Sequence, residues 1–139
     1  MPREWLALCL LMNGCALCTR TTRPAHASPE EAAQVRFPLD VPADTRTVVS
    51  GAMVTAMQLG LEDFLPLEAT PHKGATPEEV CLYRRESYEV AASPSAQEGV
   101  FFVSVSLRPG VCEAHDPILD MGAAYAVDVL GRRILAVRR

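Results

Sequence analysis

The segment 100–107, VFFVSVSL, limits the possible folds of this chain more than any other. Its apolar side chains recur at every second position, at Phe101, Val103, Val105 and Leu107. The positions between them hold Phe102, Ser104 and Ser106. A period of two indicates a β-strand with one buried face, and the serines indicate a wetter opposite face. This pattern is typical of an antiparallel sheet covered on one side only.

Three other segments have the same period and predict further strands. They are 87–92, 123–130 and 133–137. Gly131 and Arg132 separate the last two, which predicts a hairpin. We therefore expect an antiparallel sheet of about four strands.

One segment, 45–66, has the period of a helix instead. Val49, Met53, Ala56, Gly60 and Phe64 form one apolar stripe, and Pro66 ends the run. We expect its N-terminal cap at Asp44 or Thr45. The small residues Gly51, Ala52, Ala56 and Gly60 predict close packing against the sheet. The expected fold class is α+β, with one long helix packed on the antiparallel sheet. In element order this resembles cystatin-like and nuclear-transport-factor-like folds, a resemblance that carries no function.

Two tetrapeptides have the chemistry of helix starts. Ser28-Pro29-Glu30-Glu31 and Thr76-Pro77-Glu78-Glu79 each place a hydroxyl at the cap and proline at the first helical position. We expect one short turn at each, and the second leads into Cys81.

The N-terminus carries a short apolar run, Trp5–Met12 (WLALCLLM). About 20 apolar residues are needed to span a bilayer, so eight are too few, but eight suit the apolar region of a signal peptide. The alternatives are ordinary secretion, with cleavage after Ala25-His26-Ala27, and a cytosolic N-terminal helix.

The residues that follow, Leu11-Met12-Asn13-Gly14-Cys15, resemble the lipobox of bacterial lipoproteins. Gly14 and Cys15 match that motif, whereas Met12 and Asn13 depart from its commoner residues. The resemblance implies that 1–14 is a signal peptide and that Cys15 carries a membrane-anchoring lipid. The residue after Cys15 is Ala16 rather than aspartate, which implies an outer-membrane location facing the periplasm.

The remaining chain divides into a tether and a domain. Residues 15–35 are rich in Thr, Arg, Pro, Ala and Ser, and lack apolar periodicity, so we expect a flexible tether there and one domain over 36–139. Three short motifs are similar to those of small uncharacterised lipoproteins of GC-rich bacteria such as myxobacteria, a group without an assigned activity. They are Glu86-Ser87-Tyr88, Asp120-Met121-Gly122 and Gly131-Arg132-Arg133-Ile134-Leu135.

The five cysteines sort by position. The lipobox resemblance implies that Cys9 leaves with the signal peptide, that Cys15 is lipidated, and that Cys18 lies near the membrane. Cys81 and Cys112 remain as an even pair, which predicts a disulfide in an oxidising compartment and about 3–4 kcal/mol of stabilisation. We expect Cys81 to enter the first strand, so that the bridge closes the open end of a hairpin. Two buried free thiols are the alternative.

Residues that would carry chemistry are sparse. The net charge is −4 with one lysine, Lys73, so no basic patch for nucleic acid is expected. The sequence holds no GxSxG, HExxH or Walker motif, so no catalytic residue, metal or cofactor is expected, and the chain is predicted not to be an enzyme. Weak metal binding at Glu113, His115 and Asp116 is an alternative. We expect Arg84 and Arg85 at a solvated edge, and the tyrosine hydroxyls reaching water.

These observations lead to two hypotheses of function. The first is a non-enzymatic cell-envelope lipoprotein, a small disulfide-stapled domain that binds another envelope component, either protein or glycan. The alternative is a secreted or tethered inhibitor of a protease or lysozyme-like enzyme, which presents the loop 66–77 or 113–117 as a wedge.

Overall fold

The computed structural model describes residues 25–37, 46–112 and 122–139. The chain divides into two compact units, Met1–Arg46 and Thr47–Arg139. In the first unit, the described residues include the short helix α2, Pro29–Ala32, which begins with a capping box between Ser28 and Glu31. The predicted helix start at Ser28 is therefore confirmed.

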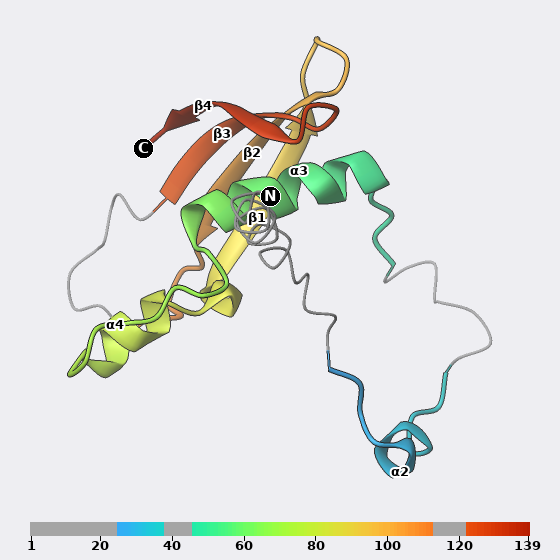
Figure 1. Cartoon of the computed structure of the whole chain (residues 1–139), viewed down its shortest axis with the longest axis vertical. Helices are drawn as coiled ribbons and strands as arrows, with labels where there is room; N and C mark the ends of the chain where they lie inside the picture. The colour runs from blue at the N-terminus through green and yellow to red at the C-terminus, as the bar shows by residue number, and fades with distance from the viewer. Residues whose placement is uncertain (1–24, 38–45, 113–121) are drawn as a thin grey trace, which may run out of the picture. The chain divides into compact units, whose positions relative to one another are not determined.

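The described residues of the second unit, 47–112 and 122–139, contain two α-helices, a 3-10 turn and four strands (Figure 1). They are α3 (Gly51–Phe64), α4 (Pro77–Leu82), η1 (Arg85–Ser87), β1 (Tyr88–Pro94), β2 (Val100–Leu107), β3 (Gly122–Asp128) and β4 (Arg133–Arg138). The strands form one antiparallel sheet in the order β1-β2-β3-β4. The α+β class and the four-stranded antiparallel sheet are confirmed, and each strand lies within two residues of its predicted ends.

The sheet has one covered face and one open face. Side chains at alternate positions of the central strands are buried, and they include Val103 and Val105 of β2 and Tyr125 and Val127 of β3. The open face holds the residues between them, among which Phe102 and Ser104 are exposed. The predicted alternation of β2 is therefore confirmed, and it follows from the period of two along each strand.

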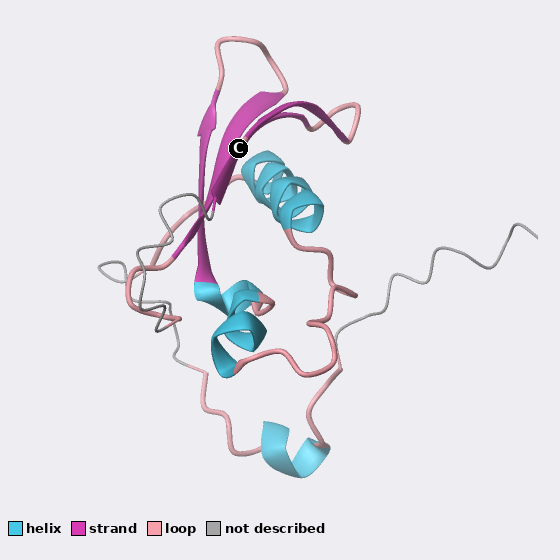
Figure 2. Cartoon of the chain, turned by 90° about the vertical axis from the view of Figure 1, so that its left-hand side faces the viewer, coloured by secondary structure: helices cyan, strands magenta, loops and turns pink. Residues whose placement is uncertain are grey.

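Helix α3 covers the buried face, and Figure 2 shows the strands curving over this helix. Ala56 of α3 is fully buried. At Gly60, a Cβ atom would lie only 3.0 Å from Cγ1 of Val103, so the helix approaches the sheet more closely than a larger residue would allow. The prediction that small residues let α3 pack against the sheet is confirmed at these two positions.

The helix is shorter than the sequence pattern predicted. It has 14 residues and begins at Gly51, and its cap is Ser50, whose side chain accepts a hydrogen bond from Met53 N at 3.2 Å. Residues 46–50 are not helical. Val48, Val49 and Thr47 are β-branched and disfavour a helix, whereas serine is a preferred cap. The expectation of one long helix was wrong, and the predicted caps Asp44 and Thr45 lie outside the described residues.

The hairpin between β3 and β4 is confirmed, with Arg132 in its turn at φ 49°. The carboxylate of Asp128 accepts a hydrogen bond from Gly131 N at 2.9 Å and forms an ion pair with Arg133 at 3.0 Å. These bonds lower the pKa of Asp128, with the Gly131 N–H as the largest cause. The turn is thus stabilised by one carboxylate at the end of β3 that bonds both the turn itself and the start of β4.

Candidate functional site

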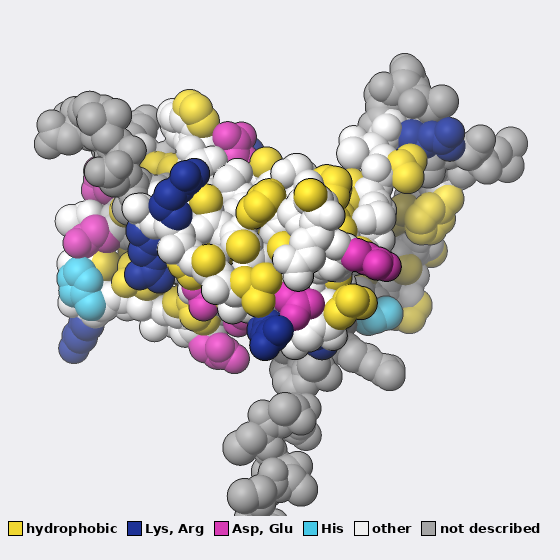
Figure 3. All heavy atoms as spheres, turned by 90° about the horizontal axis from the view of Figure 1, so that it is seen from above, with side chains coloured by type: hydrophobic (Ala, Val, Ile, Leu, Met, Phe, Trp, Pro, Cys, Tyr) yellow, Lys and Arg dark blue, Asp and Glu magenta, His cyan; other side chains and the backbone are white. Residues whose placement is uncertain are grey.

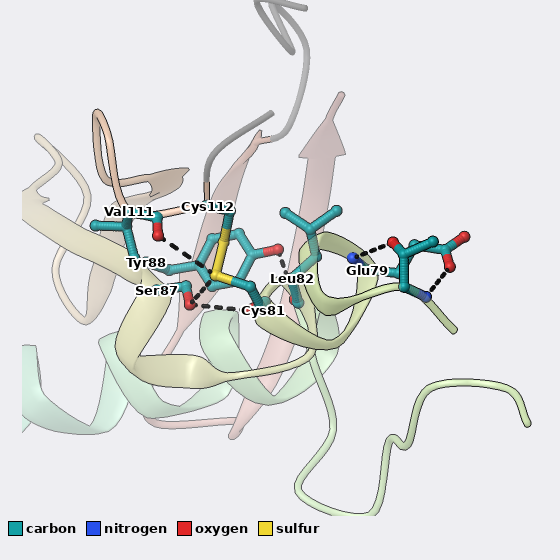
Figure 4. The surroundings of a disulfide bond; sticks show 8 residues. Glu79, Cys81, Leu82, Ser87, Tyr88, Val111 and Cys112 are labelled. Carbon is teal, nitrogen blue, oxygen red and sulfur yellow. Dashed lines mark hydrogen bonds between the residues drawn. A yellow bond between two sulfur atoms is a disulfide. The ribbon is translucent and has the colours of Figure 1, made fainter. Parts of the chain in front are cut away.

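Cys81 and Cys112 form a disulfide, as predicted, with their Cα atoms 5.7 Å apart (Figure 4). We call this bridge, together with Ser87 and Tyr88, the disulfide corner. Cys112 is buried and Cys81 is partly buried. The bridge joins helix α4 to the turn that follows β2.

The surroundings of the bridge hold α4 against the start of β1. The Ser87 hydroxyl is buried, donates a hydrogen bond to the Cys81 carbonyl at 2.8 Å, and contacts the Cys81 sulfur at 3.5 Å. The Tyr88 hydroxyl donates to the Leu82 carbonyl at 2.8 Å, and burial raises the pKa of Tyr88. Both hydroxyls donate to carbonyls in the last turn of α4, of which the Cys81 carbonyl also accepts a hydrogen bond from Arg84 N at 3.1 Å.

Cys81 does not enter a strand, which corrects the predicted geometry. It lies in α4, a helix that begins with a capping box between Thr76 and Glu79. That box starts a helix of six residues rather than the single turn expected, and β1 begins only at Tyr88. The bridge still lies at the open end of the β1–β2 hairpin, where Tyr88 pairs with Leu107.

Arg85 anchors the end of α3. Its guanidinium donates two hydrogen bonds to the Leu65 carbonyl, at 2.9 and 2.7 Å, and forms an ion pair with Glu62. The hydrogen bond from Arg85 is the largest cause of the lowered pKa of Glu62. The predicted position of Arg85 at a solvated edge was wrong, because the residue bonds a helix end 20 positions earlier in the chain.

The open face of the sheet is apolar at its centre. Phe102 is 55% exposed there and is surrounded by small side chains. They are Ala91, Ser93, Ser104, Ala124, Ala126 and Ala136. Figure 3 shows the molecule from above, with the sheet nearer to the viewer than α3. Hydrophobic side chains gather near the middle of that view. We call Phe102 and these six residues the open-face platform.

Two shallow hollows flank Phe102. One lies toward β1 and has a volume of about 300 Å³. The other has a volume of about 360 Å³, lies toward β4 and is lined by Ala124, Ala126 and Ala136, with Arg138 at its edge. An exposed aromatic ring between hollows of this kind is typical of a protein contact surface rather than of a catalytic pocket.

The Tyr125 hydroxyl differs from what the sequence predicted. It is buried, and no described residue forms a hydrogen bond of ordinary geometry with it, although the Asp63 carboxylate and the Arg139 guanidinium lie close enough to shift its pKa. Burial is the main cause of its raised pKa, to which Asp63 adds and which Arg139 opposes. The prediction that this hydroxyl reaches water was wrong, since α3 covers the face from which Tyr125 projects.

Several predicted site residues lie outside the described residues. They are Cys15, the lipobox around it, Cys18, and the 113–117 loop with Glu113, His115 and Asp116. In the described ranges, no group of three or more His, Cys, Asp or Glu side chains is placed to hold a metal ion. The sulfur of Cys112 is committed to the disulfide.

The loop 66–77 is described, and it exposes Leu67 at 72%. Its first residues follow the Arg85 contact with Leu65, and its end is the capping box of α4. Both ends of the predicted wedge are therefore anchored.

No described helix combines the length and apolar character needed to cross a membrane. No family model, curated protein or solved structure matches the chain.

Proposed function

We propose that this chain is a non-enzymatic cell-envelope lipoprotein, in which a disulfide-stapled domain is held near a membrane and binds a further envelope component. The observation that carries the proposal is the Cys81–Cys112 bridge. Stable disulfides belong to oxidising compartments such as the periplasm, so the bridge supports export.

The anchor of this proposal is a lipid on Cys15, with 1–14 as the signal peptide and 15–35 as the tether. The proposed location is the outer membrane, facing the periplasm. The support is the lipobox-like sequence before Cys15 together with the residue after it, Ala16. One lipid chain alone binds a bilayer weakly, whereas the several acyl chains of a lipoprotein bind it stably.

Binding is favoured over catalysis by the open-face platform. Catalytic sites need titratable groups held close together in a cleft, with pKa values shifted toward the working pH. The platform instead presents one exposed phenyl ring among alanines and serines. A partner is therefore expected to recognise it by shape and apolar contact.

Palmitate labelling tests the anchor. We expect the wild-type chain to incorporate label in a bacterial host, the Cys15→Ala variant to lose it, and the matched control Cys18→Ala to retain it. Label that persists in Cys15→Ala would overturn the lipoprotein proposal. Label lost in Cys18→Ala but retained in Cys15→Ala would move the anchor to Cys18.

We also propose that the helix and meander have the cystatin-like layer arrangement. The support is the order of α3 followed by β1-β2-β3-β4, with α3 across one face. An experimental structure superposed on cystatin-like folds tests this proposal. A helix that lies on the opposite face of the sheet from the helix of those folds would exclude it.

A second candidate function is inhibition of a protease or lysozyme-like enzyme. The observation in its favour is the exposed Leu67 on a loop whose two ends are anchored. Inhibition assays with Leu67→Ala beside Phe102→Ala separate the two proposals. Inhibition lost only with Leu67→Ala supports the wedge, and no inhibition of either enzyme class excludes it.

A further inference from the structure

We propose that the open face binds a second copy of this chain, so that two sheets pack face to face and the two α3 helices lie on the outside. This deepens the proposed function, because it rests on the open-face platform as the binding surface and names its partner. Two features of the platform carry it: the pairing of large with small side chains, and the placement of opposite charges.

The strand register places Phe102 beside a small residue, over which there is room for a second aromatic ring. Phe102 on β2 pairs with Ala126 on β3, and Ala126 pairs with Ala136 on β4. A two-fold axis that runs along the strands, midway between β2 and β3, turns β2 of one copy over β3 of the other. Each Phe102 then lies above Ala126 of the second copy.

The hollow over β3 and β4 receives that ring. It has a volume of about 360 Å³ and is lined by Ala124, Ala126 and Ala136. Sheets in a sandwich pack about 10 Å apart, and facing side chains must interdigitate large against small. The two-fold relation inserts both phenyl rings at once, since each copy offers one ring and one hollow.

Charges at the two edges of the sheet select this orientation. Glu89 lies on β1, at one edge, and Arg138 lies on β4, at the other. Neither forms an ion pair with any residue in the described parts of the unit. The same axis turns β1 over β4 of the second copy, which brings Glu89 toward Arg138.

The reach of the two side chains is sufficient. Glu89 pairs across the sheet with Ser106, and Arg138 belongs to the next row along the strands, with Ala124 and Ser104. Successive rows on one face are about 6.6 Å apart, a gap that a glutamate and an arginine span together. A two-fold axis across the strands would instead turn β1 over β1 and β4 over β4 of the second copy, and would leave Glu89 and Arg138 at opposite edges of the contact.

The area of the platform indicates that the contact is weak in dilute solution. Four strands and three rows cover roughly 20 Å by 20 Å, or about 400 Å² per copy. The two copies together would therefore bury about 800 Å². Stable interfaces bury about 1,200–2,000 Å² in total, so the proposed contact falls in the range of transient contacts. Anchoring both copies to one membrane raises their effective concentration, which strengthens a contact without adding area.

The test measures association of the full chain, purified from membranes in detergent, by sedimentation equilibrium over a wide concentration range. We expect a monomer–dimer equilibrium in the wild type. Phe102→Asp should weaken it at least tenfold, and the control Leu67→Asp, at an apolar residue that is also exposed but lies off the platform, should leave it unchanged. Circular dichroism and the urea midpoint of each variant check that it is folded.

Charge exchange tests the orientation. Glu89→Arg and Arg138→Glu should each weaken self-association several-fold, since each creates two like-charged contacts. A mixture of the two single variants should form a heterodimer with wild-type affinity, because both contacts then pair opposite charges. The double variant should again form a homodimer.

Three outcomes would overturn the proposal. They are a monomer at every concentration, a dimer that ignores both Phe102→Asp and the charge variants, and a monomeric chain that binds a different envelope protein or a vesicle through Phe102. The Cys15 labelling result is independent of all three. A labelled monomer overturns only the dimer, and an unlabelled dimer overturns only the anchor.

Discussion

The two faces of one sheet use the same strands and opposite distributions of side-chain size. On the covered face, the strands carry large residues such as Tyr125 and Val103, and α3 offers small ones, Ala56 and Gly60. On the open face, the strands carry alanine and serine around one large residue, Phe102. Two surfaces pack well when large side chains of one face small side chains of the other. On the covered face, the small residues of α3 meet the large residues of the strands. The open face carries both a large residue and small ones, and these are the two halves of the contact that we propose between two copies.

The largest expected difference between the faces comes from truncating one aromatic residue on each. Tyr125→Ala should lower the free energy of unfolding by about 3–5 kcal/mol, because it empties a fully packed site under α3. Phe102→Ala should lower it by less than about 1 kcal/mol, since much of that ring is already exposed. Urea unfolding at low protein concentration measures both. Equal losses would show that the open face is packed against something within the chain.

The disulfide corner fastens one end of the covered face. Reduction of the Cys81–Cys112 bridge, which spans 31 residues, should lower the free energy of unfolding by about 3–4 kcal/mol. The double variant Cys81→Ala, Cys112→Ala should show the same midpoint with and without reductant. A wild-type midpoint that reductant does not move would mean that hydrogen bonds at Ser87 and Tyr88 hold the corner unaided.

The close approach of α3 predicts a smaller effect. Gly60→Leu should destabilise the fold by about 1–3 kcal/mol, because its side chain would overlap Val103 and Tyr125. Gly51 is the matched control, since no atom lies within 4 Å of a Cβ atom there. Gly51→Leu should change stability by less than about 1 kcal/mol and should not destabilise. Comparable losses at both glycines would contradict the packing of α3 on the sheet.

The smallest effect concerns one oxygen atom on the covered face. Tyr125→Phe should raise the free energy of unfolding by up to about 1 kcal/mol, because it removes a buried hydroxyl with which no described residue forms a hydrogen bond of ordinary geometry. Tyr88→Phe should lower it by a similar amount, about 0.5–1.5 kcal/mol, because that hydroxyl donates to Leu82. Opposite signs in parallel urea titrations are the expected result.

These tyrosines also predict how stability depends on pH. Burial raises the pKa of both above the usual value of 10.0, so the fold favours the neutral phenol. Their contribution is fully present below pH 10 and is lost as the pH rises through the raised pKa values. Unfolding free energies measured from pH 8 to 11 should therefore fall at the alkaline end. The fall should be shallower in Tyr125→Phe.

Local patterns predicted most of the fold. The alternation in 100–107 gave the faces of β2, and the capping boxes at Ser28 and Thr76 gave two helix starts, since each depends on neighbours in the chain. Arg85 could not be placed in this way, because its partner Leu65 is 20 positions away and any exposed carbonyl would have served. The covered Tyr125 hydroxyl likewise depends on where α3 lies.

The candidate surface was only half visible in the sequence. Ser104 and Ser106 of β2 predict a wetter face, but the same face also carries Phe102, two positions before Ser104. A stronger signal lay in the alanines at alternate positions, Ala124, Ala126 and Ala136, whose side chains gather around that ring only once the register of the sheet is known. Register depends on pairing between strands, which no single segment encodes.

The bridge across the β1–β2 hairpin also has a mechanical consequence. A chain pulled from its two ends transmits force through the sulfur atoms, so the residues between Cys81 and Cys112 remain slack however hard the ends are drawn. The stretched length is shorter by about 100 Å than that of the reduced chain. Any translocase or protease that threads polypeptide through a narrow channel would meet a double-width loop there.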